Sequence, residues 1–431
     1  MTTAASTTVF EEIESAVRTY SRSFPAVFST AKNDTLYTAD GSRYLDFLSG
    51  AGSLNYGHNP EPVKDAVLGY LERDGLMHGL DFSTSAKAEF LTAFRDLVLK
   101  PRGLSYRVQF TSPSGTNAVE AALKLARLVT GRTNVVAFSG GFHGVSTGSL
   151  AATGSGYYRQ GLESTLPQTT HIPYPDSPLG KFDSIDLLKM LLEDPSSGVE
   201  LPAAVLLETV QGEGGVYLAP IPFLQDLREV CDQYGILLIV DDIQAGCGRT
   251  GSFFSFERAG IVPDLVTLSK SIGGYGLPMA LLLIKPELDI WRPGQHNGTF
   301  RGNQLAFVAA TAALRHYWSD GAFAEQVVKK GALVQECLER RVEGRFGAEV
   351  RGLGLMYGID LSPVPGLEAS KVSRLCFERG LIVETCGRDG EVLKLLPPLT
   401  ISQVTLSTGL DIIISAITDL ATDAECGSTT S

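Results

Sequence analysis

The sequence predicts an α/β protein with a largely parallel sheet between layers of helices, followed by a smaller α+β unit. Between residues 105 and 285, short apolar runs alternate with segments of helical periodicity, which is typical of parallel strands joined by helical crossovers. From about residue 316, a long helical stretch leads to strands punctuated by glycine. This change in pattern indicates a second unit of α+β type.

Six apolar runs are the predicted strands of the sheet. The run 236–240 consists of five consecutive aliphatic residues, as expected for a strand buried on both faces. Between the runs, the segment NAVEAALKLARLVTG has Val119, Ala122, Leu123 and Ala126 on one helical face. The predicted strands are 107–110, 135–138, 203–208, 236–240, 265–268 and 280–284.

We expect three parts along the chain: an N-terminal segment 1–55, a large domain 56–315 and a C-terminal small α+β domain 316–431. In the first part, TLYTADGSRYLDFLSG predicts a hairpin with Asp40 and Gly41 at its turn, because Asp-Gly favours tight hairpin turns. We expect this segment to pack with the small domain.

The composition narrows the classes of partner. The chain of 431 residues carries a formal charge of −12, which argues against binding to nucleic acid or to an anionic membrane. Six cysteines and six histidines are scattered without ligand-like spacing, so we expect reduced thiols and no metal site. Acids lie where a signal peptide needs bases, and no apolar segment approaches the ~20 residues that span a bilayer. We therefore expect a cytoplasmic protein with small-molecule substrates.

Candidate site residues follow the predicted strands, because ligands of open α/β sheets bind beyond the carboxyl ends of the strands. After 107–110, the loop of Ser114, Gly115 and Thr116 opens directly into a helix, whose first N–H groups and dipole favour a phosphate. The loop is neither a Walker loop nor a dinucleotide-binding fingerprint. Because glycine-rich strand-to-helix turns are common, the loop by itself leaves phosphate binding open.

Two residues that follow 135–138 are candidates for contact with a flat ring. Phe142 and His143 lie in SGGFHG, among glycines that allow close approach to a ligand, and an aromatic side chain there can stack. The alternative is a core phenylalanine beside a hydrogen-bonded histidine. Glu208, at the end of 203–208, brings a carboxylate to the same edge.

Opposite charges follow the next two strands. Asp241 ends 236–240, and Lys270 comes after 265–268 and before SIGGYGLPMA. A buried carboxylate needs a positive partner, and a desolvated lysine has a lowered pKa and can attack carbonyl carbons. As a pair, these two residues fit a simple ion pair equally well. A magnesium site at Asp241 and Asp242 would explain neither Lys270 nor the phosphate loop.

Together, the candidates match the requirements of pyridoxal 5′-phosphate. This cofactor needs a phosphate cradle, a stacking ring, a lysine that binds its aldehyde and an acid that keeps its pyridine nitrogen protonated. On this interpretation the pyridinium is the positive partner of Asp241, and Lys270 carries the cofactor.

The segment DDIQAGCGRTG, residues 241–251, resembles the signature Asp-(Asp/Glu)-x-Gln-x-Gly-x-Gly-Arg-Thr-Gly of the class III, or ω-amino acid, aminotransferases. These are pyridoxal-phosphate enzymes of fold-type I, and the likeness runs from about residue 18 to 415. The resemblance implies a mostly parallel seven-stranded sheet in the large domain. It also implies a homodimer or higher homo-oligomer with shared active sites.

The resemblance implies roles for single residues. Lys270 would bind the cofactor and shuttle a proton, Asp241 would pair with the pyridine nitrogen, and Gln244 would approach the ring hydroxyl. Thr299, in HNGTFRGNQLA, would reach the phosphate of the neighbouring subunit's cofactor. Glu208, in LLETVQGEGG, would set the position of a substrate-binding arginine. The phosphate would be held by Gly115 and Thr116, and the ring would stack on Phe142.

Four stretches, RTYSRSFPAVF, GAGSLNYGHN, DGLMHGLDFSTSAKAEFL and FTSPSGTNAVEAALKLAR, resemble the branch of the family that moves an amino group from glutamate to aspartate 4-semialdehyde by a ping-pong mechanism. One residue departs from the family. Lys394, in VLKLLPPLT, stands where most members have an arginine that clamps the substrate carboxylate, and lysine lacks the bidentate fork. The carboxylate would be bound by Lys394, by Arg22 or by Arg388; the alternative for Lys394 is a solvated strand lysine.

Several rival functions keep the same fold. An aminotransferase for γ-aminobutyrate, ornithine or another ω-amino acid differs only in its amine, and an aminomutase or racemase would need no 2-oxoglutarate. A cofactor-sensing regulator would need a DNA-binding domain. The residues before the fold are too few and too acidic for one.

Overall fold

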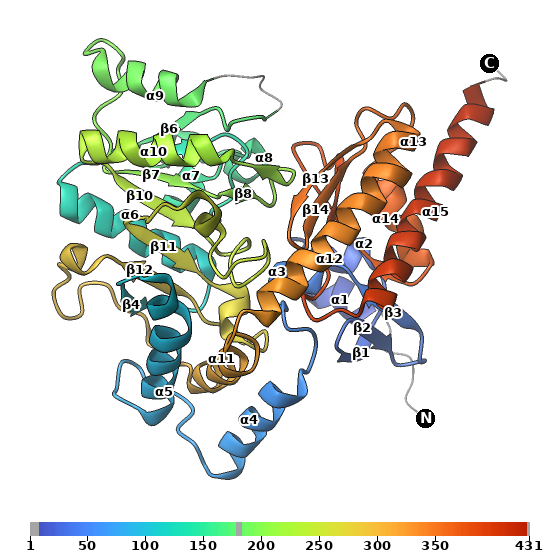
Figure 1. Cartoon of the computed structure of the whole chain (residues 1–431), viewed down its shortest axis with the longest axis horizontal. Coiled ribbons are helices and arrows are strands. Elements are labelled where there is room, and N and C mark those ends of the chain that lie inside the picture. Colours follow the sequence, from blue (N-terminus) through green and yellow to red (C-terminus); the bar gives the residue numbers. More distant parts are fainter. Residues whose placement is uncertain (1–7, 178–182, 429–431) are drawn as a thin grey trace.

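The computed structural model describes residues 8–177 and 183–428, which form two lobes (Figure 1). The larger lobe contains a seven-stranded sheet in the order β4-β12-β11-β10-β7-β5-β6. Neighbouring strands are parallel except β12, which runs antiparallel to β11 and to β4. The α/β fold with a mostly parallel sheet is therefore confirmed. The strands are β4 (Arg107–Phe110), β5 (Val135–Phe138), β6 (Thr169–Ile172), β7 (Ala204–Leu207), β10 (Leu237–Asp241), β11 (Leu265–Leu268) and β12 (Leu281–Ile284).

The sheet is buried on both faces, as the aliphatic runs predict. In β5, Val136 and Phe138 belong to one apolar cluster, whereas Val135 and Ala137 belong to another, because successive strand side chains point to opposite faces. The first cluster includes side chains of helix α10 (Ile221–Tyr234) and the second includes side chains of α6 (Gly115–Thr130). The four residues predicted on the apolar face of α6, namely Val119, Ala122, Leu123 and Ala126, are all buried.

All six predicted strands are present, with ends that differ by no more than one residue. The seventh strand, β6, was missed. Its sequence, Thr-Thr-His-Ile, is mostly polar, and only Ile172 is buried. β6 lies at the edge of the sheet, where one face and one backbone edge tolerate polar side chains.

The smaller lobe contains an antiparallel sheet in the order β13-β14-β17-β16. Three long helices accompany it: α12 (Ala322–Leu338), α14 (Ala369–Glu378) and α15 (Gln403–Ser428). The strands are β13 (Glu349–Leu353), β14 (Met356–Asp360), β16 (Glu384–Cys386) and β17 (Val392–Leu395).

Helix α15 corrects one expectation from the sequence. Its segment Gln403–Thr422, with a mean hydropathy of 1.5, is long and apolar enough to cross a membrane. The same helix buries Leu410, Ile413 and Ile417 in the apolar core, and a core helix passes the same test of length and composition.

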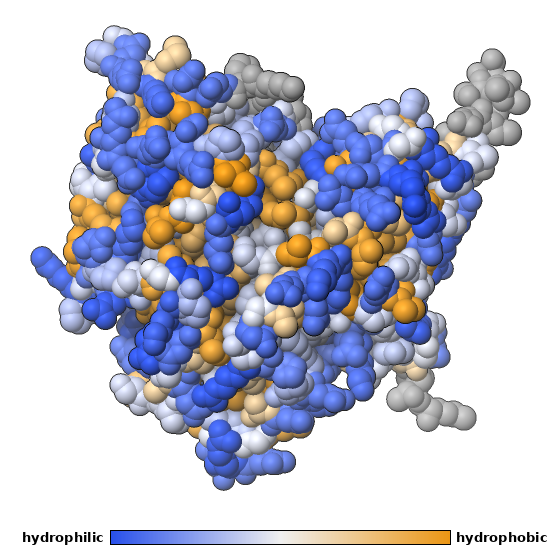
Figure 2. All heavy atoms as spheres, viewed as in Figure 1, coloured by the Kyte–Doolittle hydropathy of each residue, from blue (hydrophilic) through white to orange (hydrophobic). Residues whose placement is uncertain are grey.

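On the face drawn in Figure 2, hydrophobic residues form small patches among hydrophilic ones.

The N-terminal strands join the smaller lobe. β1 (Phe28–Lys32), β2 (Thr35–Thr38) and β3 (Arg43–Asp46) form a sheet with β15 (Leu381–Ile382) in the order β1-β2-β3-β15. The predicted hairpin is confirmed: β2 and β3 pair antiparallel, and Gly41 has a φ of 88°, which suits glycine. The domain limits at residues 55/56 and 315/316 stay predictions.

Short elements complete the two lobes and their connections. Helix α11 packs against α4 and α5 at the base of the larger lobe (Figure 1). The remaining elements are α1 (Thr8–Ile13), α2 (Tyr20–Ser23), α3 (Ser49–Gly52), α4 (Glu61–Glu72), α5 (Ser85–Ala93), α7 (Thr147–Ala152), α8 (Gly156–Arg159), α9 (Ser184–Glu193), β8 (Val210–Gln211), β9 (Tyr217–Leu218), α11 (Gln304–Tyr317) and α13 (Gly344–Phe346).

Candidate active site

The strand ends of the larger sheet bring most of the predicted site residues to one pocket of about 210 Å³. The loop after β4 contributes Ser114, Gly115 and Thr116, and the loop after β5 contributes Phe142 and His143. The pocket is completed by Glu208 after β7, Asp241 at the end of β10, Gln244 after β10 and Lys270 after β11.

Asp241 is buried at the end of β10 and is held on both oxygens. His143 Nδ1 lies 2.7 Å from Oδ2, and the Thr267 hydroxyl donates to Oδ1 over 3.1 Å. Burial alone would lower the pKa of His143, but the hydrogen bond and charge of Asp241 outweigh burial, and the pKa is raised. Asp242 does not line the pocket; its carboxylate accepts the Ser255 amide over 3.1 Å. The two aspartates therefore have different roles.

Lys270 follows β11 in a left-handed backbone conformation, with a φ of 52°. This conformation is uncommon for a residue with a side chain, and such strain is often found at functional sites. Burial lowers the pKa of Lys270, the charge of Glu213 opposes this effect, and the charge of Lys394 adds to it. Among the described residues, the Lys270 amine has no hydrogen bond or ion pair, so the simple Asp241–Lys270 pair is not formed.

The loop before α6 has the form of an anion cradle. α6 begins at Gly115 and is 16 residues long, so its first amides and its dipole point toward the pocket. A Cβ on Gly115 would lie 2.8 Å from Cδ1 of Ile243, so a larger residue there would have to displace the Ile243 side chain that lines the pocket. The hydroxyl of Thr116 is 2.7 Å from that of Ser146, which in turn donates to Glu120 over 2.7 Å. The loop is therefore fixed in place from behind.

The carboxylate of Glu208 accepts hydrogen bonds from backbone amides and does not pair with an arginine. Its Oε1 accepts the Phe142 amide over 2.9 Å, and its Oε2 accepts the Gly212 amide over 3.1 Å. Burial raises the pKa of Glu208 to about 7. The expectation that Glu208 positions a substrate-binding arginine does not fit these contacts. Glu208 instead fixes the backbone that carries the Phe142 ring.

A second acid, Glu213, is the one that pairs with a cation. Lys394 Nζ lies 2.6 Å from Glu213 Oε1 and 3.2 Å from Glu384 Oε1. Lys394 is 0% exposed, so the interpretation of this residue as a solvated strand lysine is wrong. Gln244 Nε2 also donates to Glu213 over 3.1 Å. Sequence reasoning missed both Glu213 and Glu384.

Besides Lys394, three predicted residues lie outside this pocket. Arg388 is exposed in the turn between β16 and β17 and lines a larger cavity of about 590 Å³, which shares Phe142 and Glu213 with the first. Arg22 is exposed on α2, and Thr299 is exposed at the start of the 3₁₀ turn Thr299–Gly302.

A family model described as aminotransferase class-III matches residues 16–417. The chain belongs to this family. A relative from Bordetella parapertussis named diaminobutyrate--2-oxoglutarate transaminase is 53% identical to this class-III aminotransferase over 420 residues, or 97% of this chain and 96% of the relative. Relatives with the same name from Halalkalibacterium halodurans and Vibrio cholerae are 52% and 54% identical, and the matches cover 97% and 94% of this chain and 97% and 98% of theirs.

Solved structures of the same fold are aminotransferases too. The ornithine aminotransferase of Toxoplasma gondii, reported with partial occupancy of pyridoxal phosphate at its active site, superposes with a TM-score of 0.84 at 25% identity, over 97% of this chain and 94% of that chain. An (S)-enantioselective omega-transaminase from Thermomicrobium roseum gives a TM-score of 0.83 at 26% identity, over 95% and 96% of the two chains.

The cofactor of class-III aminotransferases is pyridoxal 5′-phosphate, and the residues of this pocket fit it. The Lys270 amine is without a partner in the described chain, and so is the buried Oε1 of Gln244. The amides at the start of α6 suit the phosphate, and buried Asp241 suits a cationic ring nitrogen.

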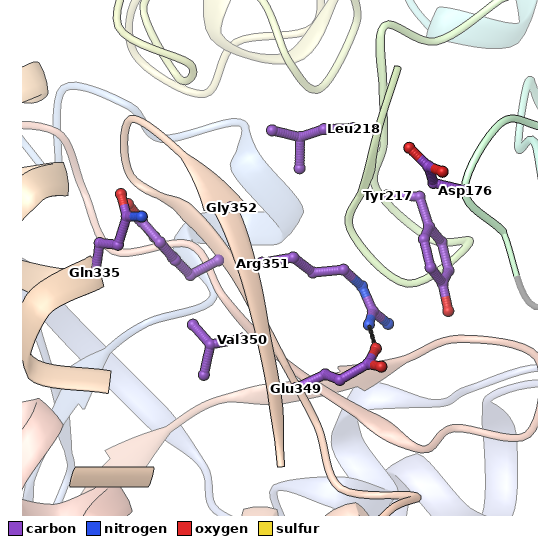
Figure 3. Close-up of a pocket in the computed structure, with 9 residues that line it drawn as sticks. Asp176, Tyr217, Leu218, Gln335, Glu349, Val350, Arg351 and Gly352 are labelled. Atoms are coloured by element: carbon purple, nitrogen blue, oxygen red, sulfur yellow. Dashed lines mark hydrogen bonds and ion pairs between the residues drawn. The ribbon is translucent and has the colours of Figure 1, made fainter. Parts of the chain in front are cut away.

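One more contact supports the site from outside this pocket (Figure 3). Arg351, on β13 of the smaller lobe, donates to the Gly215 carbonyl over 2.8 Å and lies 4.0 Å above the Tyr217 ring. It also forms ion pairs with Glu349, drawn in Figure 3, and with Asp360. Arg351 therefore ties the β8–β9 hairpin, whose loop carries Glu213, to the smaller lobe.

Proposed function

We propose that this class-III aminotransferase moves an amino group between L-glutamate and L-aspartate 4-semialdehyde, with L-2,4-diaminobutyrate and 2-oxoglutarate as products. The observation that carries the substrate choice is the similarity of 52–54%, over nearly the whole chain, to relatives named for this reaction. Like other aminotransferases, the protein acts on small molecules.

Different residues of the pocket bind different parts of the cofactor. When bound, pyridoxal phosphate supplies an aldehyde that takes up the amino group and a cationic ring that accepts electrons from the substrate. Asp241, held by His143 and Thr267, stabilises the charge on the ring nitrogen. Phe142 offers its ring to one face, and Ser114, Gly115 and Thr116 hold the phosphate.

Lys270 moves the proton. A pKa lowered by burial leaves more of the amine neutral near physiological pH, as a general base requires. Lys270 would hold the aldehyde of the bound cofactor. Its amine, when free, would take the proton from the carbon that bears the amino group and return a proton one position along.

Three cationic side chains are candidates to bind the substrate carboxylate. Lys394 forms an ion pair with Glu213, and Glu213 lines the pocket. Arg388 lines the adjoining cavity. Arg22 lies on α2, whose Tyr20 donates to Glu384 over 3.1 Å. We propose Lys394 as the principal contact, because its amine pairs with Glu213, which lines the pocket.

A second copy of the chain completes the site. The segments around residues 76–82 and 299–302 contact each other, with the Gly79 amide donating to the Gly302 carbonyl over 3.0 Å. Both expose apolar side chains that are unfavourable in water, among them Met77, Phe82 and Phe300. We propose that this surface is the subunit interface and delivers Thr299 to the partner's phosphate. Light scattering should then show a dimer for the wild type and a monomer for Phe82→Glu/Phe300→Glu.

The substrate is tested with a panel of amines. The enzyme loaded with cofactor is incubated with 2-oxoglutarate and one of 2,4-diaminobutyrate, ornithine or γ-aminobutyrate, and glutamate is measured. The proposal expects the largest kcat/KM for diaminobutyrate and aspartate 4-semialdehyde as its product. A larger kcat/KM for ornithine or γ-aminobutyrate would assign the enzyme to another amine.

A further inference from the structure

We propose that Glu384 determines substrate specificity by binding the α-ammonium group of the diamine, the group that distinguishes 2,4-diaminobutyrate from γ-aminobutyrate. This inference rests on the proposed function and deepens it. It assigns a role to an acid that pairs with Lys394 and does not line the cofactor pocket.

The cluster that carries the inference consists of Glu213, Glu384 and Lys394. Glu384 and Lys394 are cross-strand neighbours in the β16–β17 pair, and Glu213 comes from the β8–β9 loop. The Lys394 amine lies between the two carboxylates, at 2.6 Å from Glu213 and 3.2 Å from Glu384. The charges of all three side chains act on the amine of Lys270, so the cluster lies beside the reacting group.

The cluster holds one acid more than it holds bases. Burial would raise the pKa of Glu213, but the charges of Lys394 and Lys270 lower it to about 2. Burial would lower the pKa of Lys394, but its two acids raise that value. These two residues are therefore a matched ion pair. Burial raises the pKa of Glu384, and the charge of Lys394 only partly opposes this effect.

Glu384 is also short of hydrogen-bond donors. A carboxylate can accept about four hydrogen bonds. In the described chain, Oε2 accepts one from the Tyr20 hydroxyl over 3.1 Å, and buried Oε1 accepts none of good geometry. Glu384 is only 6% exposed, and the one partner of its Oε1 is the Lys394 amine at 3.2 Å, which Glu384 shares with Glu213; a buried carboxylate with few donors is costly. An ammonium group would supply both the missing donors and the missing charge.

The cluster is next to both cavities. Glu213 lines the cofactor pocket and the adjoining cavity, and Thr385 and Cys386, which follow Glu384, line the adjoining cavity. An amine that reacts at Lys270 therefore extends its far end toward the cluster. In diaminobutyrate that end carries an ammonium and a carboxylate, whereas in γ-aminobutyrate it carries a carboxylate alone. The ammonium of the first favours the ionised form of the buried acid and pairs with it, whereas the second offers Glu384 no cation.

The two amines are the matched pair for the test. Each is mixed with cofactor-loaded enzyme without a keto acid, and the loss of visible cofactor absorbance gives an apparent Kd and a rate for the half-reaction. The wild type should prefer diaminobutyrate. In Glu384→Gln the preference should fall about tenfold or more, as expected for one charge-assisted contact, mainly through a weaker Kd for diaminobutyrate.

Control variants separate this role from a structural one. Glu368→Gln removes the same charge from an exposed acid that pairs with Lys371 and should keep the wild-type preference. Glu384→Asp keeps the charge but withdraws it by one methylene, so its preference should fall between those of the wild type and Glu384→Gln. It serves as the test if the glutamine variant does not fold.

The outcomes are distinct. If the wild type does not prefer diaminobutyrate, the proposed function and this inference are both wrong. If the wild type prefers it and the Glu384 variants keep the full preference, or lose binding of both amines equally, only the role of Glu384 is wrong.

Discussion

The two ends of the pocket are built differently. At the cofactor end, Asp241, Lys270 and the Ser114 loop follow strands of one sheet, so their positions are fixed by its hydrogen-bonded backbone. At the substrate end, Glu213, Glu384 and Lys394 come from segments of both lobes. The cofactor end is rigid and local, whereas the substrate end exists only when the two lobes are in place.

The largest expected effect lies at the cofactor end. Lys270→Ala should reduce turnover of diaminobutyrate with 2-oxoglutarate by about 10⁴-fold or more, because it removes the residue that we propose as both the attachment point and the base. Its far-ultraviolet circular dichroism should match that of the wild type. Activity within a few-fold of the wild type would show that another residue moves the proton.

Asp241→Asn tests the charge at the same end. It keeps the shape and should reduce kcat by about 10²–10³-fold, the range typical of a lost electrostatic contact. Asp242→Asn is the matched control, since Asp242 is buried one residue further and binds the Ser255 amide instead of lining the pocket. Equal losses in the two variants would contradict the separate roles of these aspartates.

Lys394→Met tests the substrate end through stability. It leaves two buried carboxylates without their cation, so the free energy of unfolding should fall by about 3–5 kcal/mol. Lys371→Met, which breaks an exposed pair with Glu368, should change it by less than about 1 kcal/mol. Both changes in the free energy of unfolding are to be measured by urea unfolding of the apo form. Similar small losses would mean that Lys394 and its acids do not join the lobes.

The smallest expected effect is a change in pH dependence. Burial raises the pKa of Asp242 to about 7 in the folded chain. As pH rises, the unfolded chain therefore loses this proton first, so Asp242 lowers stability progressively up to about pH 7 and fully above it. The unfolding free energy of Asp242→Asn relative to the wild type should increase from about pH 5 to about pH 8. If this difference in unfolding free energy does not change with pH, the pKa of Asp242 is not raised in the folded chain.

Sequence reasoning reached the cofactor end because its signals are local. The run 236–240 and the signature that begins at Asp241 are contiguous, and strand order alone brings Lys270 to the same edge. By contrast, Lys394 in the apolar run VLKLL could have been marked as buried, but only the fold reveals its two acids. Glu213 lies in the same segment as Glu208, LLETVQGEGG, and nothing in the sequence says which of these two acids meets a cation.

The Arg351 contact has a mechanical consequence. Glu213 belongs by sequence to the larger lobe, but its segment is hydrogen-bonded to the smaller lobe. Arg351 donates to the Gly215 carbonyl, and the Gly387 amide donates to the carbonyl of Glu213 over 3.0 Å. Any rotation of the smaller lobe would therefore drag this acid along. A hinge movement between the lobes would thus be transmitted as a change of charge beside the reacting amine.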